Sequence, residues 1–127
     1  MPSYEQDWCD ALATAVGAVD AEHDPIRLLY VVTDTEDGKV AFNLELEKGS
    51  VVAATAGKLP RGEKADVTVT IKEPILHQLW AGEQRRDVAF MRGDIKIEGA
   101  YHRWLDELVP LFEADPWTSA WAAATAS

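Results

Sequence analysis

Residues 88–112 constrain the fold of this chain more than any other segment, because three regular elements follow one another there without a long loop. A short helix ends at Gly93, an alternating strand follows, and an amphipathic helix begins after Gly99. In the strand, Ile95 and Ile97 alternate with charged residues, as expected for a strand with one buried face. In the second helix the apolar residues recur on one helical face: Tyr101, Trp104, Leu105, Leu108, Val109 and Phe112.

The preceding part of the chain predicts one helix and four strands. Ser3 and Gln6 have the spacing of a capping box, and helical periodicity then continues to about Ala21. Runs of β-favouring residues, separated by turn signals, predict strands at 27–34, 40–47, 50–56 and 66–72. We expect these strands to continue as a meander, with helices packed on one face of the sheet.

The remaining helices are delimited by proline and glycine. Pro74 suits a first helical position, and Gly82 ends that helix. Pro110 lacks the amide hydrogen that a regular helix needs, so the last long helix should kink or stop near Val109. Asp115-Pro116 suits the N-cap and first position of a terminal helix. Its apolar face comprises Trp117, Ala120, Trp121 and Ala124. We interpret this tail as a flap or a contact surface, with a frayed chain end as the alternative.

The length of 127 residues predicts a single domain. We expect an α+β fold, in which a five-stranded, mostly antiparallel sheet carries its helices on one face. The domain is divided into an N-terminal helix, a four-stranded meander, a segment with helices and the fifth strand, and a C-terminal tail, at 1–22, 27–72, 74–113 and 114–127.

Charge and cysteine content exclude several classes of function. Twenty-two acidic residues against 12 basic ones give a net charge of −10, which disfavours nucleic acid and anionic bilayers as partners. No stretch reaches the roughly 18 apolar residues needed to span a bilayer, so stable membrane insertion is not expected. Cys9 is the single cysteine, which excludes an intramolecular disulfide and favours the cytoplasm. We interpret Cys9 as a packing residue whose pKa is raised by Asp7 and Asp10.

Catalytic motifs are absent from the sequence. Without a Gly-rich phosphate loop, HExxH, CxxC or GxSxG, we expect no metal ion, no other cofactor and no enzymatic activity. His23 fits a structural role at a helix exit, and His77 is expected to be solvated. His102 and Asp106 share the polar face of the last long helix, and they are the acid-base candidates if the chain is instead a small enzyme.

The segment Ala89-Phe90-Met91-Arg92-Gly93, continued by Asp94-Ile95-Lys96-Ile97-Glu98-Gly99, resembles the sterol carrier (nonspecific lipid-transfer) proteins. That family has a helix ending in Ala-Phe-Met-x-Gly, then Lys-hydrophobic-Lys-hydrophobic-x-Gly, then another helix. Asp94 replaces the first lysine of the pattern, whereas Lys96 is kept. The resemblance implies an apolar tunnel between sheet and helices, which would hold a sterol, a fatty acyl chain or a similar lipid.

The resemblance and the apolar periodicity together predict the lining of this tunnel. The expected lining residues are Phe42, Leu44, Leu76, Leu79, Trp80, Phe90, Met91, Tyr101, Trp104, Leu105, Leu108 and Phe112. Tyr30, Asn43 and Tyr101 are candidates to orient a polar group of the ligand. Delivery by collision with a partner enzyme fits the acidic surface. The alternatives are an accessory or homodimerising domain with a filled cavity, and a small enzyme for an apolar substrate.

Overall fold

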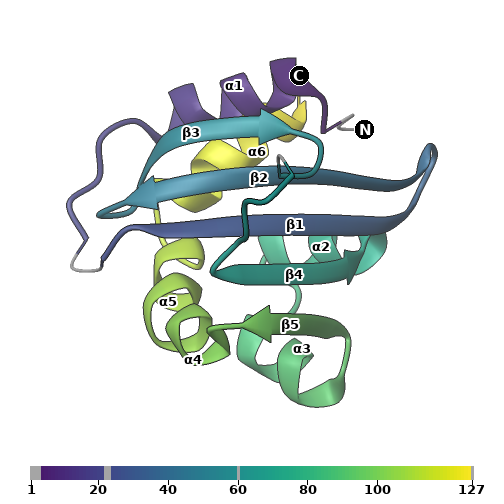
Figure 1. Ribbon diagram of the computed structural model, residues 1–127. Helices are drawn as coiled ribbons and strands as arrows, with labels where there is room; N and C mark the ends of the chain where they lie inside the picture. Colours follow the sequence, from purple (N-terminus) through teal and green to yellow (C-terminus); the bar gives the residue numbers. More distant parts are fainter. Residues whose placement is uncertain (1–3, 22–23, 60, 127) are drawn as a thin grey trace.

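The computed structural model describes residues 4–21, 24–59 and 61–126, which form a sheet with helices packed on one face (Figure 1). The strands are β1 (Ile26–Thr35), β2 (Gly38–Glu47), β3 (Ser50–Ala56), β4 (Val67–Lys72) and β5 (Ile95–Gly99). The helices are α1 (Gln6–Val16), α2 (Glu73–Trp80), α3 (Arg86–Arg92), α4 (Tyr101–Arg103), the π-helical turn η1 (Trp104–Leu108), α5 (Val109–Phe112) and α6 (Trp117–Ala126). The predicted α+β class and five-stranded sheet are confirmed.

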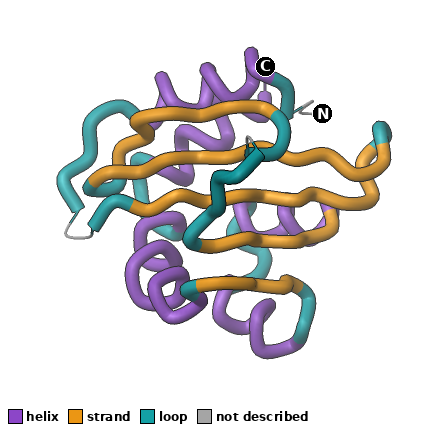
Figure 2. Tube along the Cα trace, viewed as in Figure 1, coloured by secondary structure: helices purple, strands orange, loops and turns teal. Residues whose placement is uncertain are grey.

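The sheet has the order β3-β2-β1-β4-β5, and its β1–β4 pair is parallel whereas the other neighbours are antiparallel. The prediction of a four-stranded meander is therefore wrong for β4. After β3 the chain crosses the sheet face opposite the helices and returns to the starting end of β1 (Figure 2). A strand that begins there runs in the same direction as β1, so the pair must be parallel. Asp66 fixes this start, because its Oδ2 accepts a hydrogen bond from the Arg27 amide at 2.8 Å.

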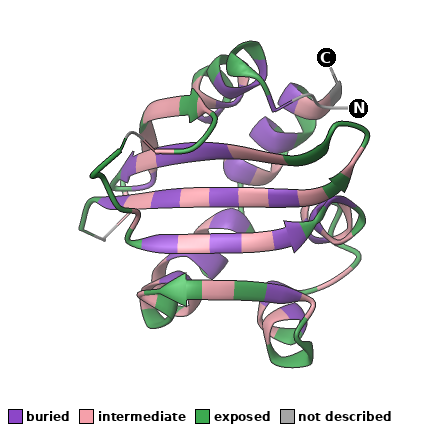
Figure 3. Ribbon diagram, turned by 45° about the vertical axis from the view of Figure 1, so that its right-hand side comes forward, coloured by how far each residue is buried: buried purple, intermediate pink, exposed green. Residues whose placement is uncertain are grey.

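The core lies between the sheet and the helices. Along β1 every second residue from Ile26 to Val32 is buried, and β4 repeats this pattern at Val67, Val69 and Ile71. Figure 3 shows the resulting alternation along the central strands. The two-residue period of a strand places these side chains on one face, which is the face that the helices cover.

Helix α1 differs from its predicted bounds at both ends. It stops at Val16 rather than near Ala21, because Gly17 adopts a positive φ of 66° at the C-cap. Glu5 is the N-cap residue and makes no side-chain cap hydrogen bond. The predicted capping residue Ser3 lies outside the described residues.

Gln6, predicted to complete a capping box, instead joins α1 to β3. Its Nε2 donates to the Ala54 carbonyl at 2.9 Å, and its Oε1 accepts from the Ala56 amide at 3.0 Å. These two bonds satisfy backbone groups of β3, which is an edge strand of the sheet. They also fix α1 beside this edge (Figure 1).

The last long helix does not stop near Val109 as predicted; it changes there from a π-helical to an α-helical turn and continues to Phe112. The π-helical turn η1 ends at Leu108, α5 begins at Val109, and Pro110 lies in the first turn of α5. After α5 the Asp115-Pro116 peptide bond is cis, and α6 begins at Trp117 rather than at Pro116. Asp115 therefore lies one residue before the N-cap position that was predicted for it, but its Oδ1 still accepts a hydrogen bond from the Ser119 amide in the first turn at 3.2 Å.

Candidate functional site

Aromatic side chains fill the layer between the sheet and the helices. Tyr30 from β1 and Phe42 from β2 stack with their ring centroids 5.0 Å apart. Trp80 from α2 stacks on Trp121 from α6 at 4.2 Å, with the ring planes only 2° apart. Phe112 from α5 completes the layer 5.5 Å from Trp80. Offset and stacked rings at these separations attract one another beyond the effect of area burial.

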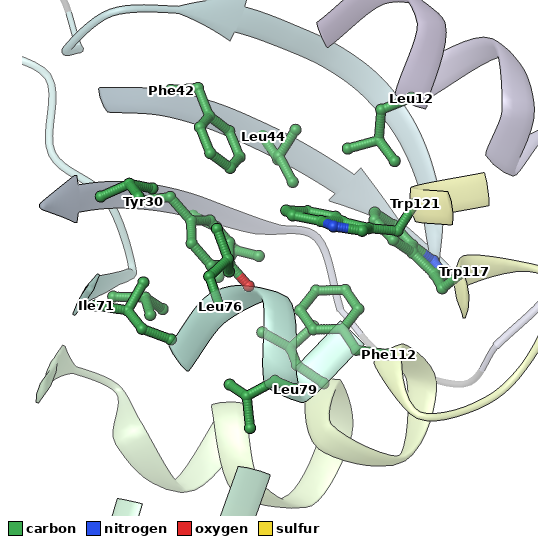
Figure 4. Close-up of a cluster of buried hydrophobic side chains, with 14 of the residues drawn as sticks. Leu12, Tyr30, Phe42, Leu44, Ile71, Leu76, Leu79, Phe112, Trp117 and Trp121 are labelled. Carbon is green, nitrogen blue, oxygen red and sulfur yellow. The ribbon is translucent and has the colours of Figure 1, made fainter. Parts of the chain in front are cut away.

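Helix α6 supplies two tryptophans to this layer, Trp117 and Trp121. Both are buried, together with Ala120 and Ala124, which confirms the predicted apolar face of the helix. Figure 4 shows the two rings directed from α6 into the cluster that contains Phe42 and Phe112. Since no side chain of this helix was among the expected tunnel lining, its contribution is a finding of the tertiary structure.

The two tryptophans differ in how their indole N–H groups are satisfied. Trp117 Nε1 donates to the Gly49 carbonyl at 2.8 Å, which anchors α6 to the turn between β2 and β3. Trp121 Nε1 is buried and has no hydrogen-bond partner. A buried donor without a partner costs about 1–3 kcal/mol of desolvation. Trp121 is therefore the less strongly held of the two.

Most of the expected lining residues do face the interior. Buried members are Phe42, Leu44, Leu76, Leu79, Trp104, Leu108 and Phe112, and half-buried members are Trp80, Phe90 and Leu105. Met91 and Tyr101 do not reach it, because they are 85% and 52% exposed. Ala89 provides the buried face of α3, and a residue two positions later lies nearly opposite on a helix, so Met91 points outward. The role of the inward-facing residues as a ligand lining stays a prediction.

Three hollows of the surface lie outside this aromatic layer. One, of about 610 Å³, lies beside the beginning of β1, and another, of about 500 Å³, lies between α1 and α6. A third, of about 330 Å³, opens beside Leu79, Trp80, Arg86, Glu113 and Thr118. None of the three passes through the layer between sheet and helices. A ligand chain that entered the layer from one of these three hollows would have to displace side chains of that layer.

Arg86 is a buried cation next to the third hollow, and sequence reasoning missed it. Its exposed fraction is 2%, and its guanidinium carbon lies 4.3 Å from the Trp80 ring centroid. Burial lowers the pKa of Arg86, and the nearby Tyr30 and Glu113 partly oppose this effect. Arg85 and Arg86 are adjacent in a stretch of charged and polar residues, so no pattern in the sequence distinguishes Arg86 from the exposed Arg85.

The expected polar candidates lie in different environments. Tyr30 is buried in the aromatic layer, where burial raises its pKa to about 12. The Asn43 side chain donates from Nδ2 to the Gly57 carbonyl at 3.2 Å, and it thereby holds the end of β3. Tyr101 stacks on Phe90 from the outside. Of the three, Tyr30 alone shares the aromatic layer, so it is the remaining candidate there for orienting a polar group.

The predicted acid-base candidates His102 and Asp106 do not face the aromatic layer. His102 and Asp106 are both exposed on the helix surface. His77 is half-buried rather than solvated, and its Nε2 lies 3.9 Å from the buried Glu73 carboxylate. The predicted structural residue His23 lies outside the described residues. Among residues 4–21, 24–59 and 61–126, no group of three or more His, Cys, Asp or Glu side chains is arranged to hold a metal ion.

Cys9 is fully buried in α1, as expected for a packing residue. Burial raises its pKa to about 11, with Asp10 as a second cause. The predicted direction is confirmed, although burial rather than a neighbouring carboxylate is the main cause. Within the described part of the chain, no helix is both long and apolar enough to cross a bilayer.

Solved structures with the same fold are sterol carrier proteins. A crystal structure of sterol carrier protein 2 is 20% identical to the chain with a TM-score of 0.64, covering 87% of this chain and 97% of its own. The solution structure of a palmitated sterol carrier protein 2-like protein, SCP2L2, from Aedes aegypti is 17% identical with a TM-score of 0.66. It covers 90% of this chain and 96% of its own. The fold implied by the motif around Gly93 and Gly99 is thus confirmed.

A similar domain also forms part of a larger enzyme, the inverting sec-alkylsulfatase Pisa1 from a Pseudomonas species. The two chains are 26% identical over 84% of this chain but only 14% of the enzyme, with a TM-score of 0.55. Curated protein sequences give no significant match. The family described as alkyl sulfatase C-terminal matches residues 4–117, which is most of the chain, and the chain belongs to this family.

Proposed function

We propose that this domain binds the hydrocarbon chain of a small molecule between its sheet and its helices, without catalysing a reaction, and that α6 is the movable wall of the site. The observation that carries the proposal is the composition of this layer: two of its largest side chains, Trp117 and Trp121, belong to one short helix. The palmitated Aedes aegypti protein of the same fold supports a fatty acyl chain as the class of ligand.

The energetics of exchanging the tryptophans for a ligand are nearly balanced. A buried aromatic side chain removes about 150–250 Å² from water, so two of them contribute about 8–12 kcal/mol at about 25 cal/mol per Å². A ten- to twelve-carbon chain gains about 8–10 kcal/mol at about 0.8 kcal/mol per methylene group. Release of the Trp121 Nε1 to solvent favours opening further. A ligand of this length could therefore replace the rings at little net cost.

A second candidate is an accessory domain that uses its filled interior for stability and its surface to contact an enzyme or a second copy of itself. The family match favours this candidate, because the related segment in the Pseudomonas enzyme is a small part of an alkylsulfatase. The hollow between α1 and α6 would then belong to a contact surface. In this case the tryptophans stay in place and no chain enters. A cytoplasmic location is compatible with both candidates and stays a prediction.

Native mass spectrometry combined with calorimetric titration separates the two candidates. The protein is titrated with decanoate and decyl sulfate below their micellar concentrations and with decan-1-ol below its solubility limit, while sedimentation velocity records its oligomeric state. We expect one-to-one complexes and a change in tryptophan fluorescence, because Trp80 and Trp121 lie where the chain would enter. A protein that takes up none of the three compounds, and that also copurifies without an apolar adduct, would refute the carrier proposal.

A further inference from the structure

The guanidinium of Arg86 is buried without a full set of partners. Its Nη2 has no hydrogen-bond partner, and its Nη1 lies 3.8 Å from the nearer Glu113 carboxylate oxygen, which is beyond hydrogen-bond distance. That Glu113 oxygen instead accepts a hydrogen bond from the Arg86 backbone amide at 3.3 Å. Charged groups are seldom buried unless paired and hydrogen-bonded, since desolvation is costly. The arrangement leaves a buried positive donor available in a chain with a net charge of −10.

The surroundings of Arg86 connect this donor both to solvent and to the proposed chain site. Arg86 lines the 330 Å³ hollow together with Leu79 and Trp80, so the hollow has a cationic and an apolar wall. The same Trp80 ring stacks on Trp121, the side chain that we propose is displaced by the hydrocarbon chain. A molecule with its head at Arg86 would thus have its tail directed along Trp80 into the aromatic layer.

The chemistry of the donor specifies the head group. A guanidinium presents its N–H donors in a planar fork that matches two oxygens of one carboxylate or sulfate. We propose that Arg86 is an anion-recognition residue and that the ligand is a single hydrocarbon chain ending in one carboxylate or sulfate group. This inference rests on the proposed function, because it assigns the polar end of the same ligand.

Glu113 acts as the internal counter-ion in the absence of ligand. Its side chain is one-third exposed, so it can turn toward solvent when an anion occupies the guanidinium. The exposed Arg85, whose Nη2 donates to Asp87 Oδ2 at 2.8 Å, lines the same hollow without being buried. Arg85 is therefore a matched control for the role of charge alone.

The test compares three ligands of equal chain length in the wild-type protein, which requires no variant to fold. Decyl sulfate and decanoate, below their micellar concentrations, and decan-1-ol, below its solubility limit, are titrated by calorimetry at 0.15 M salt. Hydrogen bonds to a charged group in a buried site predict that at least one anion binds about tenfold or more tightly than the alcohol. The ratio between sulfate and carboxylate then identifies the preferred head group.

Two variants assign the preference to Arg86. In Arg86→Gln the anions should bind no more tightly than decan-1-ol does to the same variant, whereas Arg85→Gln should keep the anion preference. Circular dichroism checks that each variant folds. If Arg86→Gln does not fold, Glu113→Gln takes its place: removal of the competing carboxylate should raise the ratio of anion affinity to alcohol affinity, and an unchanged ratio would overturn the assignment of Arg86.

The outcomes separate this inference from the proposed function. Equal binding of alcohol and anions, or an anion preference that persists in Arg86→Gln, overturns the assignment of Arg86 while the chain-binding function stands. Binding of none of the three ligands overturns the proposed function and this inference with it. An anion preference that is lost in Arg86→Gln and kept in Arg85→Gln supports both.

Discussion

Replacement of Trp121 by alanine tests whether the aromatic layer is a fixed core or whether a ligand can displace its side chains. The Trp121 side chain is 3% exposed, so nearly its whole area of about 150–250 Å² is buried, which corresponds to about 4–6 kcal/mol. The loss of stacking on Trp80 adds about 0.5–1.5 kcal/mol to the destabilisation. Removal of the buried Nε1, which has no partner, lowers the destabilisation by about 1–3 kcal/mol. The expected net destabilisation of Trp121→Ala is about 4 kcal/mol, within the usual range for buried tryptophan.

The same substitution should strengthen ligand binding. If a hydrocarbon chain must displace Trp121, removal of the ring removes that cost, and decanoate affinity should rise by about tenfold or more. Ligand at about one hundred times its dissociation constant should then restore about 2.7 kcal/mol of stability. Urea denaturation with and without decanoate measures the stability, and calorimetry measures the affinity.

Met91→Ala is the matched control for this experiment. Met91 is 85% exposed, so its truncation should change the unfolding free energy by less than about 0.5 kcal/mol and leave decanoate affinity unchanged. A Trp121→Ala variant that is destabilised as expected but gains no affinity would show that the layer is a fixed core. A variant as stable as the wild type would instead refute the packing argument.

Two further predictions concern backbone geometry and pH. Gly99→Ala should destabilise the fold by more than about 2 kcal/mol in urea denaturation, because φ is +89° and a Cβ would lie 2.3 Å from the Asp66 carbonyl oxygen. Gly82→Ala, which has a positive φ but nothing within 4 Å of its Cβ, should cost only about 1 kcal/mol, and equal losses would contradict the steric explanation. The pKa of Cys9 rises from 9.0 to about 11 on folding, so its contribution to stability is present below pH 9 and is lost as pH rises toward 11. Cys9→Ala should therefore show a shallower decline in stability between pH 8 and pH 10, by on the order of 1 kcal/mol, and an unchanged decline would refute this assignment.

Local patterns in the sequence were sufficient to locate most helices and strands. The strand at 50–56 was predicted with the bounds that the structure has, and the other strands differ by one or two residues at their ends. Alternation and turn residues are local properties, and the alternation of apolar and polar residues within a strand indicates which of its faces is buried. The hydrogen bond between Asp115 and the first turn of α6 and the change of helix type before Pro110 are local for the same reason, although the predicted N-cap position and helix end were wrong.

The pairing of β4 and the true end of α1 required the tertiary structure. The sequence of residues 57–66 does not indicate that the chain crosses the sheet, because loops of similar composition form both antiparallel turns and crossover connections. Gly17 ends α1 although the apolar spacing continues beyond it, since backbone conformation at one glycine overrides periodicity. Periodicity alone therefore overestimated the helix.

The candidate site shows the same division between local and long-range information. The sequence by itself determined that a bulky apolar layer lies on one side of a five-stranded sheet, because helical and strand periods encode burial residue by residue. Only the tertiary structure decided that Trp117 and Trp121 occupy this layer, that Met91 and Tyr101 stay outside it, and that Arg86 is buried beside it. Periodicity indicates that a side chain is buried. Which side chains bury it depends on contacts between segments that are far apart in the chain, and the local pattern does not contain this information.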